Sequence, residues 1–368
     1  MKRIIVLVKN ALESLPPIMT VSQVLADLGN DVIVVCSVAN EETRSAFANR
    51  GIKIYEACPG CQISSSPMAK FFRWKRFARN AWRVIDSYDD NSLLWVGSAD
   101  TALAMGKELF KRPFVFEILE LYDRLKHYLV LMAPYARRAR AVVVPEPCRA
   151  AIFRVWFKLG STPFVLPNKT YGESLPRCMP VSNPDNAREM KRVANRKLVL
   201  YQSHYLRMEI LDIARALKRL GEGYVLGTMG EIQDQRISTR LRREYPELVH
   251  FSYMPAPQHL EVTSHAYIGL LIYNYESLNN VFCAPNKIWE YSALALPMLC
   301  NELPMLSQQL AYYGAGETFR TGDLTSIEEA IGEIESRYAD YCDGSARLFT
   351  SVSLHERVGH ILSSVGVR

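Results

Sequence analysis

Short apolar runs alternate with amphipathic stretches along the first half of the chain. The runs are rich in Val and Ile and contain few polar positions, which predicts strands that are buried on both faces of a sheet. They span residues 3–8, 31–36, 53–57, 93–97, 113–118, 141–145 and 163–167. The stretches between them, such as MTVSQVLADLG at 19–29, carry apolar residues at helical spacing and end at a glycine. This alternation predicts a doubly wound parallel sheet.

A second series of strands follows a polar, proline-containing segment at 172–192. Helical patterns separate its apolar runs, which span residues 197–202, 224–229, 248–253, 267–273 and 297–302. The segment at 172–192 lacks periodicity, which is typical of a linker. The pattern therefore predicts an α/β protein with two Rossmann-like, doubly wound domains. Two such domains facing one another would form a cleft lined by the carboxyl ends of strands, where such sheets bind ligands.

The length of the chain agrees with two domains, since 368 residues are about twice the usual domain size. We place the boundaries where the pattern changes. The expected parts are a first Rossmann-like domain at 1–170, a linker at 171–196, a second Rossmann-like domain at 197–345, and a C-terminal helix at 346–368 that packs back toward the first domain.

Composition and charge exclude several classes of protein. With 49% hydrophobic and 22% charged residues, the chain is typical of a globular protein. The net charge of +6 tolerates an anionic partner, but no nucleic-acid-reading motif accompanies it, so we expect no nucleic-acid partner. No apolar run reaches the roughly 18 residues that a membrane span needs. The opening MKRIIVLVK is too short for a signal-peptide core, so we expect a cytoplasmic protein.

Of the eight cysteines, only Cys58 and Cys61 lie close together, in EACPGCQ. A zinc site would need a second pair of ligands, and the surrounding sequence is not thioredoxin-like. Incidental reduced thiols and a metal or redox site are the two interpretations. We favour reduced thiols and assign no metal.

The segment CAPNKIWEYSALALPMLC at 283–300 holds a lysine in an unfavourable place. Pro285 and Asn286 mark the start of a helix, because Asn caps helices and Pro precedes or opens them. Lys287 then lies in the first turn, where the helix already carries partial positive charge. A bound anion would make that position favourable. The alternative is an intrahelical pair of Lys287 with Glu290 on an exposed face.

The wider segment NYESLNNVFCAPNKIWEYSALALPMLCNELP at 274–304 resembles the signature of bacterial glycosyltransferases of the GT-B fold, family 4 type. Further segments fit the family in the expected order, namely 115–123, 165–168, 198–217, 314–331 and 349–358. The resemblance implies a nucleotide-diphosphate sugar, UDP- or GDP-linked, bound mainly by the second domain. It further implies metal-independent transfer, with retained configuration, to a glycan or lipid-linked acceptor in surface polysaccharide synthesis.

The resemblance also implies roles for residues in the second domain. Lys287 and Arg207 would clamp the diphosphate, with Asn286 beside them at the helix start. Glu290 would bind the ribose hydroxyls. Ser203 stands in the loop after a strand and would present its backbone N–H to a phosphate.

Two further positions are weaker members of this donor site. Gly230, in GTMGE at 227–231, lies where the family holds the nucleotide base. Many family members carry a glutamate eight residues before the one that matches Glu290, but this chain has Phe282 there. Asn280 would contact the donor sugar in place of that glutamate. Ala295 stands where the pattern has a helix-ending glycine, which predicts an altered helix end.

Catalytic groups in the first domain are harder to assign. The family often has a histidine where this chain has Leu119. Asp100 and Glu120 are the acidic candidates, each as a base or as an acceptor for a substrate hydroxyl. Each is also a candidate cap for the helix that follows its strand, and for either residue alone we favour the cap.

The segment AKFFRWKRFARNAWRVI at 69–85 carries six basic residues and five aromatic residues. One interpretation is an interfacial helix that inserts aromatic side chains into an anionic membrane surface. The other is an ordinary helix whose apolar stripe covers the sheet. A second basic and aromatic stretch at 153–160 favours peripheral membrane association.

Two other functions stay open at this stage. A nucleotide-sugar epimerase shares the two-domain architecture, although it would need acidic and histidine residues around the sugar. A non-catalytic partner protein with the same fold is the second, because Leu119 and Phe282 depart from the family pattern.

Overall fold

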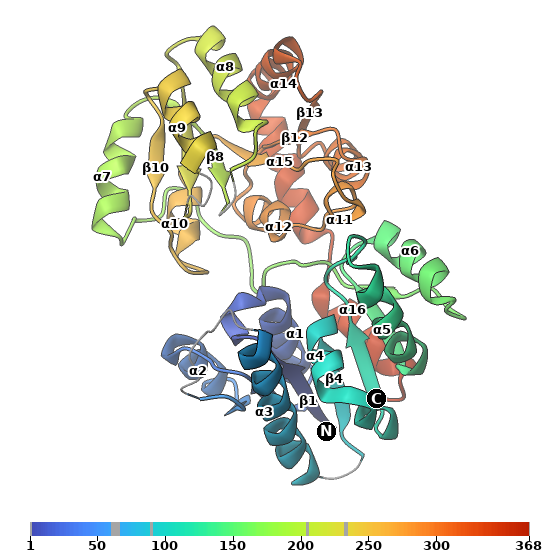
Figure 1. Cartoon of the computed structure of the whole chain (residues 1–368). Helices are drawn as coiled ribbons and strands as arrows, with labels where there is room; N and C mark the ends of the chain where they lie inside the picture. Colours follow the sequence, from blue (N-terminus) through green and yellow to red (C-terminus); the bar gives the residue numbers. More distant parts are fainter. Residues whose placement is uncertain (1, 60–66, 89–90, 204–205, 232–234, 368) are drawn as a thin grey trace. The chain divides into compact units, whose positions relative to one another are not determined.

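The computed structural model describes residues 2–59, 67–88, 91–203, 206–231 and 235–367. The chain divides into two compact units (Figure 1). Unit 1 comprises residues 1–171 and 353–368, and unit 2 comprises residues 172–352.

Unit 1 is built on a seven-stranded sheet in which every recorded strand pair is parallel. The strand order is β3-β2-β1-β4-β5-β6-β7, so the direction of winding reverses between β1 and β4. The bounds are β1 Arg3–Val8, β2 Asp31–Cys36, β3 Lys53–Glu56, β4 Leu93–Gly97, β5 Phe114–Glu117, β6 Ala141–Val144 and β7 Phe164–Val165. The predicted doubly wound parallel sheet is confirmed.

Helices cover this sheet, and the last one comes from the far end of the chain. They are η1 Leu12–Ser14, α1 Pro16–Asp27, α2 Glu41–Ala48, α3 Pro67–Asp86, α4 Ala99–Met105, η2 Gly106–Lys111, α5 Lys126–Arg138, α6 Pro147–Phe157 and α16 Leu354–Ser364. Helix α16, red in Figure 1, lies in the unit that is otherwise blue to green. Its Leu354 and Val358 share one hydrophobic cluster with Val21 and Val24 of α1.

Unit 2 repeats the architecture with six strands in the order β10-β9-β8-β11-β12-β13. The bounds are β8 Lys197–Gln202, β9 Tyr224–Met229, β10 Val249–Phe251, β11 Ile268–Leu271, β12 Met298–Asn301 and β13 Gly316–Phe319. Winding reverses between β8 and β11. The sequence pattern did not predict β13, because Glu317 and Thr318 interrupt its apolar character at the edge of the sheet.

The helices of unit 2 are α7 Pro184–Val193, α8 Ile210–Leu220, α9 Gln235–Glu244, α10 His259–Thr263, α11 Leu278–Val281, α12 Asn286–Ala293, α13 Pro304–Tyr313, α14 Leu324–Ser336 and α15 Tyr338–Thr350. Helix α15 contributes Leu348 and Phe349 to the core of unit 2. The chain therefore passes back to unit 1 after residue 352, a few residues later than the sequence pattern indicated.

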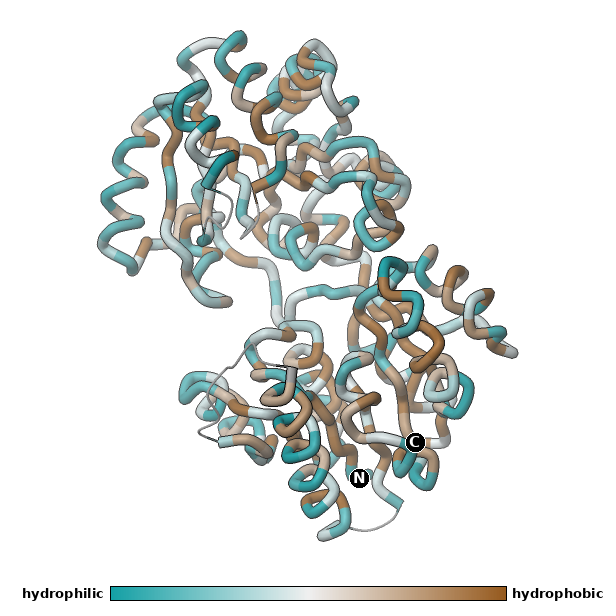
Figure 2. Tube along the Cα trace, in the orientation of Figure 1, coloured by the Kyte–Doolittle hydropathy of each residue, from teal (hydrophilic) through white to brown (hydrophobic). Residues whose placement is uncertain are grey.

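The segment expected as a linker at 171–196 is mostly an ordered part of unit 2. Asn183 caps α7 by accepting hydrogen bonds from two backbone N–H groups of its first turn. The buried Asn186 side chain donates to the Ser252 carbonyl and accepts from the Ser252 N–H just beyond β10. Helix α7 is largely hydrophilic (Figure 2), which explains why its pattern resembled a linker.

The end of α12 keeps the geometry that a glycine normally provides. Ala295 has φ +48°, and the Leu296 N–H donates to the Tyr291 carbonyl at 2.9 Å, as in a Schellman motif. The expected change in the helix end is therefore wrong. The alanine instead adopts a left-handed backbone conformation, which brings its Cβ atom too close to the following carbonyl oxygen.

Replacing Ala295 with glycine should raise the free energy of unfolding by about 0.5–1 kcal/mol. The left-handed conformation costs alanine about 1–2 kcal/mol, and the greater flexibility of unfolded glycine offsets part of the gain. Denaturant unfolding measures the change. Ala346→Gly in α15 is the control and should destabilise by up to about 1 kcal/mol. A loss of stability in Ala295→Gly would contradict the strain argument.

Candidate functional site

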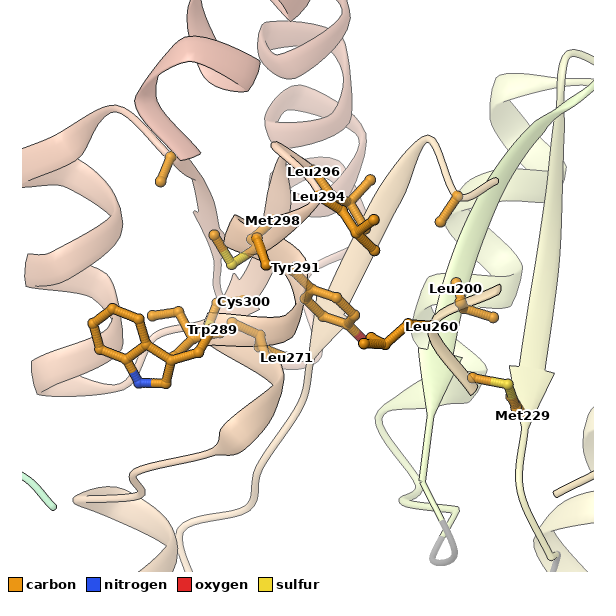
Figure 3. Packing of buried hydrophobic residues seen from close by; sticks show 14 of the residues in the cluster. Leu200, Met229, Leu260, Leu271, Trp289, Tyr291, Leu294, Leu296, Met298 and Cys300 are labelled. Atoms are coloured by element: carbon orange, nitrogen blue, oxygen red, sulfur yellow. The ribbon is translucent and has the colours of Figure 1, made fainter. Parts of the chain in front are cut away.

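Helix α12 presents its first turn at the carboxyl edge of the unit 2 sheet. Its Trp289 and Tyr291 pack into the core with Leu271 of β11 and with Met298 of β12 (Figure 3), which holds the helix in place. The helix begins after Pro285, whose backbone is extended, and no side chain among the described residues caps it. Asn286 is the first helical residue, so the prediction that it acts as a cap is wrong.

Two cations from different segments meet around one tyrosine ring. The Lys287 Nζ lies 5.3 Å from the Tyr201 ring centroid and 5.5 Å from that of Tyr273. The Arg207 guanidinium carbon lies 5.3 Å from the Tyr273 centroid. Tyr201 belongs to β8, and Tyr273 follows β11. The two cations therefore meet at the topological switch point, where doubly wound sheets bind ligands.

Neither cation is neutralised by a carboxylate in the part of the chain that the structure describes. No acidic side chain there lies within 4.0 Å of the Lys287 ammonium or the Arg207 guanidinium. Burial lowers the pKa of Lys287 to about 8, and the Arg207 charge acts in the same direction against the opposing effect of Glu290. Two like charges near an uncapped helix N-terminus make an electropositive site that a polyanion would stabilise.

Glu290 is buried, with 9% of its surface exposed. Its Oε2 accepts a hydrogen bond from Gln202 Nε2 and lies 3.3 Å from His259 Nε2. The interpretation of Lys287 and Glu290 as a pair on an exposed helix face is therefore wrong. The Oε1 atom of Glu290 has no hydrogen-bond partner among the described residues, so it can accept a hydrogen bond from a ligand hydroxyl group.

A short network keeps the Glu290 carboxylate charged. Thr263 donates to the Gln202 side-chain oxygen at 2.8 Å, which orients the Gln202 amide toward Glu290. Burial alone would raise the pKa of Glu290, but His259, Lys287 and Gln202 together lower it. Burial also disfavours the imidazolium, yet the carboxylate outweighs it and raises the pKa of His259. Glu290 is thus a fixed, ionised acceptor.

Ser203 and Gly230 lie at the same edge of the sheet, but their backbone N–H groups serve the fold. The Ser203 N–H donates to the Met229 carbonyl at 2.9 Å, so it is engaged in the fold, and its role toward a phosphate stays a prediction. The Gly230 N–H donates to the Phe251 carbonyl. Gly230 has φ +125°, a conformation that requires glycine.

Asn280 belongs to the segment that connects β11 to α12. Its Nδ2 donates to the Asn274 Oδ1 at 2.5 Å. Its backbone N–H donates to the Oγ of Ser277, which caps α11. The side chain is therefore held close to the end of β11. Its role toward a donor sugar stays a prediction.

Sequence reasoning missed several members of this cluster. Tyr201 and Tyr273 continue apolar strands and were interpreted as core, while Gln202 and His259 were not singled out. Their position along the chain could have identified these residues as candidates for the site. Residues at the ends of the two strands that flank a switch point lie where such folds bind ligands.

In unit 1, Asp100 pairs with Lys9, which lies just beyond the neighbouring strand β1. The Lys9 Nζ lies 3.0 Å from Asp100 Oδ2, and the Tyr128 hydroxyl donates to Oδ1. Ser98, not Asp100, caps α4 by accepting from the Thr101 N–H. The interpretation of Asp100 as a cap is therefore wrong. The ion pair lies at the switch point of the unit 1 sheet, since Lys9 follows β1 and Asp100 follows β4.

Glu120 follows β5 and is half-exposed. Its Oε2 lies 3.7 Å from the guanidinium of Arg149, which is itself buried. Leu125 occupies the N-cap position of α5, so the interpretation of Glu120 as a cap is also wrong. Both acidic candidates thus keep a cationic neighbour at the carboxyl edge of unit 1, and their chemical roles stay predictions.

The described residues contain neither a metal cluster nor a membrane-spanning helix. No group of three or more His, Cys, Asp or Glu side chains in them is arranged to hold a metal ion. Cys58 is buried, and Cys61 lies outside the described residues. Within the same part of the chain, no helix is both long enough and apolar enough to cross a membrane.

Comparisons with known proteins place the fold. No family model and no curated protein matches the sequence. Solved structures do match. HepE from Anabaena, in complex with UDP and glucose, aligns with a TM-score of 0.69 and 11% identity over 99% of this chain and 100% of its own. The chain has the GT-B fold.

Two further GT-B neighbours differ in the activity that they are assigned. A glycosyltransferase from Rickettsia africae aligns with a TM-score of 0.66 and 13% identity, over 99% of this chain and 98% of its own. A putative UDP-N-acetylglucosamine 2-epimerase from Listeria monocytogenes aligns with a TM-score of 0.66 and 11% identity, over 99% of this chain and 96% of its own.

Proposed function

We propose that this chain is a glycosyltransferase of the hexosyltransferase type that uses a nucleotide-diphosphate sugar. The observation that carries the proposal is the pair of cations, Lys287 and Arg207, held around Tyr273 without a carboxylate partner among the described residues. A diphosphate supplies the missing negative charge. HepE, which has the same fold, binds UDP and UDP-glucose.

The charges of the site suit departure of the nucleotide. When the bond between sugar and diphosphate breaks, negative charge grows on the leaving phosphate, and cations already in position stabilise it. Lys287, Arg207 and the N-terminus of α12 supply that charge without a metal ion. Glu290, whose Oε1 has no hydrogen-bond partner among the described residues, would accept a hydrogen bond from a ribose hydroxyl and orient the nucleotide.

Unit 1 would bind the acceptor. Asp100 and Glu120 lie at the carboxyl edge of its sheet, and each would accept a hydroxyl of a glycan or lipid-linked saccharide. We assign the reaction to surface polysaccharide synthesis at the inner face of the membrane. By resemblance, the transferred sugar keeps its anomeric configuration.

Epimerisation of a nucleotide sugar is the second candidate, because a putative epimerase has the same fold. The two reactions differ in their products. A transferase releases the nucleoside diphosphate and joins the sugar to an acceptor or to water, whereas epimerisation leaves a sugar with inverted configuration at one carbon. Product analysis by NMR after incubation with UDP-glucose and UDP-N-acetylglucosamine distinguishes them.

Calorimetric titration with UDP, GDP, CMP and ADP tests the donor site directly. One diphosphate, expected to be UDP, should bind with a micromolar Kd, and CMP should bind much more weakly because it lacks the second phosphate. No binding of any of the four nucleotides would overturn the proposed function. If CMP bound as tightly as UDP, the diphosphate clamp would no longer be part of the proposed function.

A further inference from the structure

His259 begins the short helix α10 and lies against the carboxylate of Glu290. Its side chain is 14% exposed, and its Nε2 lies 3.3 Å from Glu290 Oε2. The same oxygen accepts a hydrogen bond from Gln202 Nε2. Both contacts therefore fall on Oε2, and in the part of the chain that the structure describes Oε1 receives none.

Helix α10 holds this carboxylate by two routes. His259, at its first position, contacts Oε2 directly. Thr263, one turn later, donates to the Gln202 side-chain oxygen at 2.8 Å, so the Gln202 amide presents its N–H group to Oε2. Glu290 belongs to α12 and Gln202 to the end of β8, so three separate segments fix the direction in which Oε1 points.

We propose that His259 positions the Glu290 carboxylate for a ribose hydroxyl and makes the preference of the site for ribonucleotides depend on pH, a role that rests on the nucleotide site proposed above. An imidazolium donates a charge-assisted hydrogen bond to a carboxylate, which is about twice as strong as a neutral one. Glu290 then keeps one geometry before the ligand arrives. A ligand hydroxyl can bond to Oε1 without the cost of ordering the carboxylate.

The charge on the His259 ring is set by its surroundings. Burial disfavours the imidazolium, but the Glu290 carboxylate and the Pro255 backbone outweigh it and raise the pKa of His259 above its ordinary value of 6.5. Glu290 is the charged group that faces the ring from α12, whereas Glu261 of α10 is bound by the Ser182 N–H and hydroxyl. As the pH rises through the raised pKa, the ring loses its charge and its hold on Oε2 weakens.

Two neighbouring cations would act on a different part of the ligand. Lys287 and Arg207 lie around Tyr273, where they would bind the diphosphate. Lys287 also loses its charge as the pH rises, since burial lowers its pKa to about 8. UDP and 2′,3′-dideoxyuridine 5′-diphosphate (ddUDP) carry the same diphosphate and differ only in the two ribose hydroxyls. The ratio of their Kd values therefore cancels the effect of Lys287 and reports on the contact with Glu290.

Calorimetric titration with UDP and ddUDP at pH 6 and pH 9 tests the role of His259. At pH 6 the wild type should bind UDP about 10- to 100-fold more tightly than ddUDP, because a hydrogen bond to a charged group is lost with the hydroxyls. At pH 9 this ratio should be smaller by about threefold or more. His259→Gln keeps a side-chain N–H group without the charge, so its ratio should be reduced at pH 6 and should not change with pH.

His265→Gln is the matched control, because it makes the same substitution just beyond α10. The His265 Nε2 lies 2.7 Å from the Met179 carbonyl, and its loss should leave the ratio of the two Kd values unchanged at both pH values. The affinity of His259→Gln for ddUDP should match that of the wild type, which shows that the variant is folded.

The outcomes separate this role from the proposed function. If UDP binds but the ratio of the wild type stays constant with pH, or if His259→Gln keeps the pH dependence of the wild type, the proposed role of His259 is wrong and the nucleotide site stands. If the wild type binds no nucleoside diphosphate, the nucleotide site is wrong and so is this role.

Discussion

The Lys287→Ala variant is expected to bind UDP about 30- to 100-fold more weakly than the wild type. Lys287 shares Tyr273 with Arg207 and has no carboxylate partner among the described residues, so its charge is available to the ligand. A hydrogen bond to a charged group is worth about 1.5–3 kcal/mol, and each 1.4 kcal/mol changes Kd tenfold. Calorimetric titration of both proteins measures the loss.

An exposed control substitution and a second substitution in the site show whether the effect belongs to the site. Lys218→Ala removes an exposed lysine from the last turn of α8 in the same unit and should leave Kd unchanged. Arg207→Ala should weaken binding as well, since it removes the second cation from Tyr273. Unchanged affinity in Lys287→Ala would show that the diphosphate does not bind at α12.

The same lysine makes UDP binding depend on pH in a predictable direction. Burial lowers the pKa of Lys287 to about 8 in the free protein, so the ammonium is lost as the pH rises above that value. A bound diphosphate favours the charged form, and binding must then take up a proton. Kd should rise by up to about tenfold per pH unit above pH 8. Lys287→Arg should flatten this dependence, because arginine keeps its charge.

The Glu117→Gln variant is expected to be more stable than the wild type at pH 8, by about 2 kcal/mol. Glu117 ends β5, is 2% exposed, and accepts a hydrogen bond from Trp95 Nε1. Burial raises the pKa of Glu117 to about 7 from an ordinary value of 4.5. This difference corresponds to about 3 kcal/mol of stability that is lost when both states are ionised. Part of this gain in stability is lost in the glutamine variant, because its side-chain NH2 group is a new hydrogen-bond donor in the core.

The sign of the pH dependence follows from the raised pKa. Below pH 4.5, Glu117 is protonated in both the folded and the unfolded state, and its contribution is fully present. As the pH rises toward 7, the unfolded state releases its proton first, so stability falls. Glu117→Gln should remove this part of the slope.

Unfolding midpoints at pH 5 and pH 8 for the wild type and Glu117→Gln measure the difference. Glu108→Gln, an exposed position in η2, is the control and should change neither midpoint by a comparable amount. If Glu117→Gln keeps the pH slope of the wild type, the buried carboxyl is not the group that titrates.

Local patterns along the chain were enough to predict both sheets. Strands such as β1 and β8 are apolar at nearly every position because both faces are covered, and that signal does not depend on distant residues. The pattern failed where burial is partial. Helix α7 and strand β13 are half-polar, so neither separated clearly from a linker or a loop.

The residues of the candidate donor site divide in the same way. Lys287 was recognisable from sequence, because a cation in the first turn conflicts with the helix dipole. Its surroundings were not. Tyr201, Tyr273 and His259 come from separate segments, and only the parallel arrangement of β8 and β11 brings the two tyrosines around the cations.

The sequence by itself determined the fold class, the existence of two doubly wound units and the anomaly at Lys287. Those features depend on hydrophobic periodicity and helix polarity, which act over a few residues. Only the tertiary structure decided that Glu290 is buried against Gln202 and His259, and that Asp100 pairs with Lys9. It also decided that α3 is covered along its second half and exposed along its first. Burial and ion pairing depend on which distant segments fold against one another, and no local pattern contains that information.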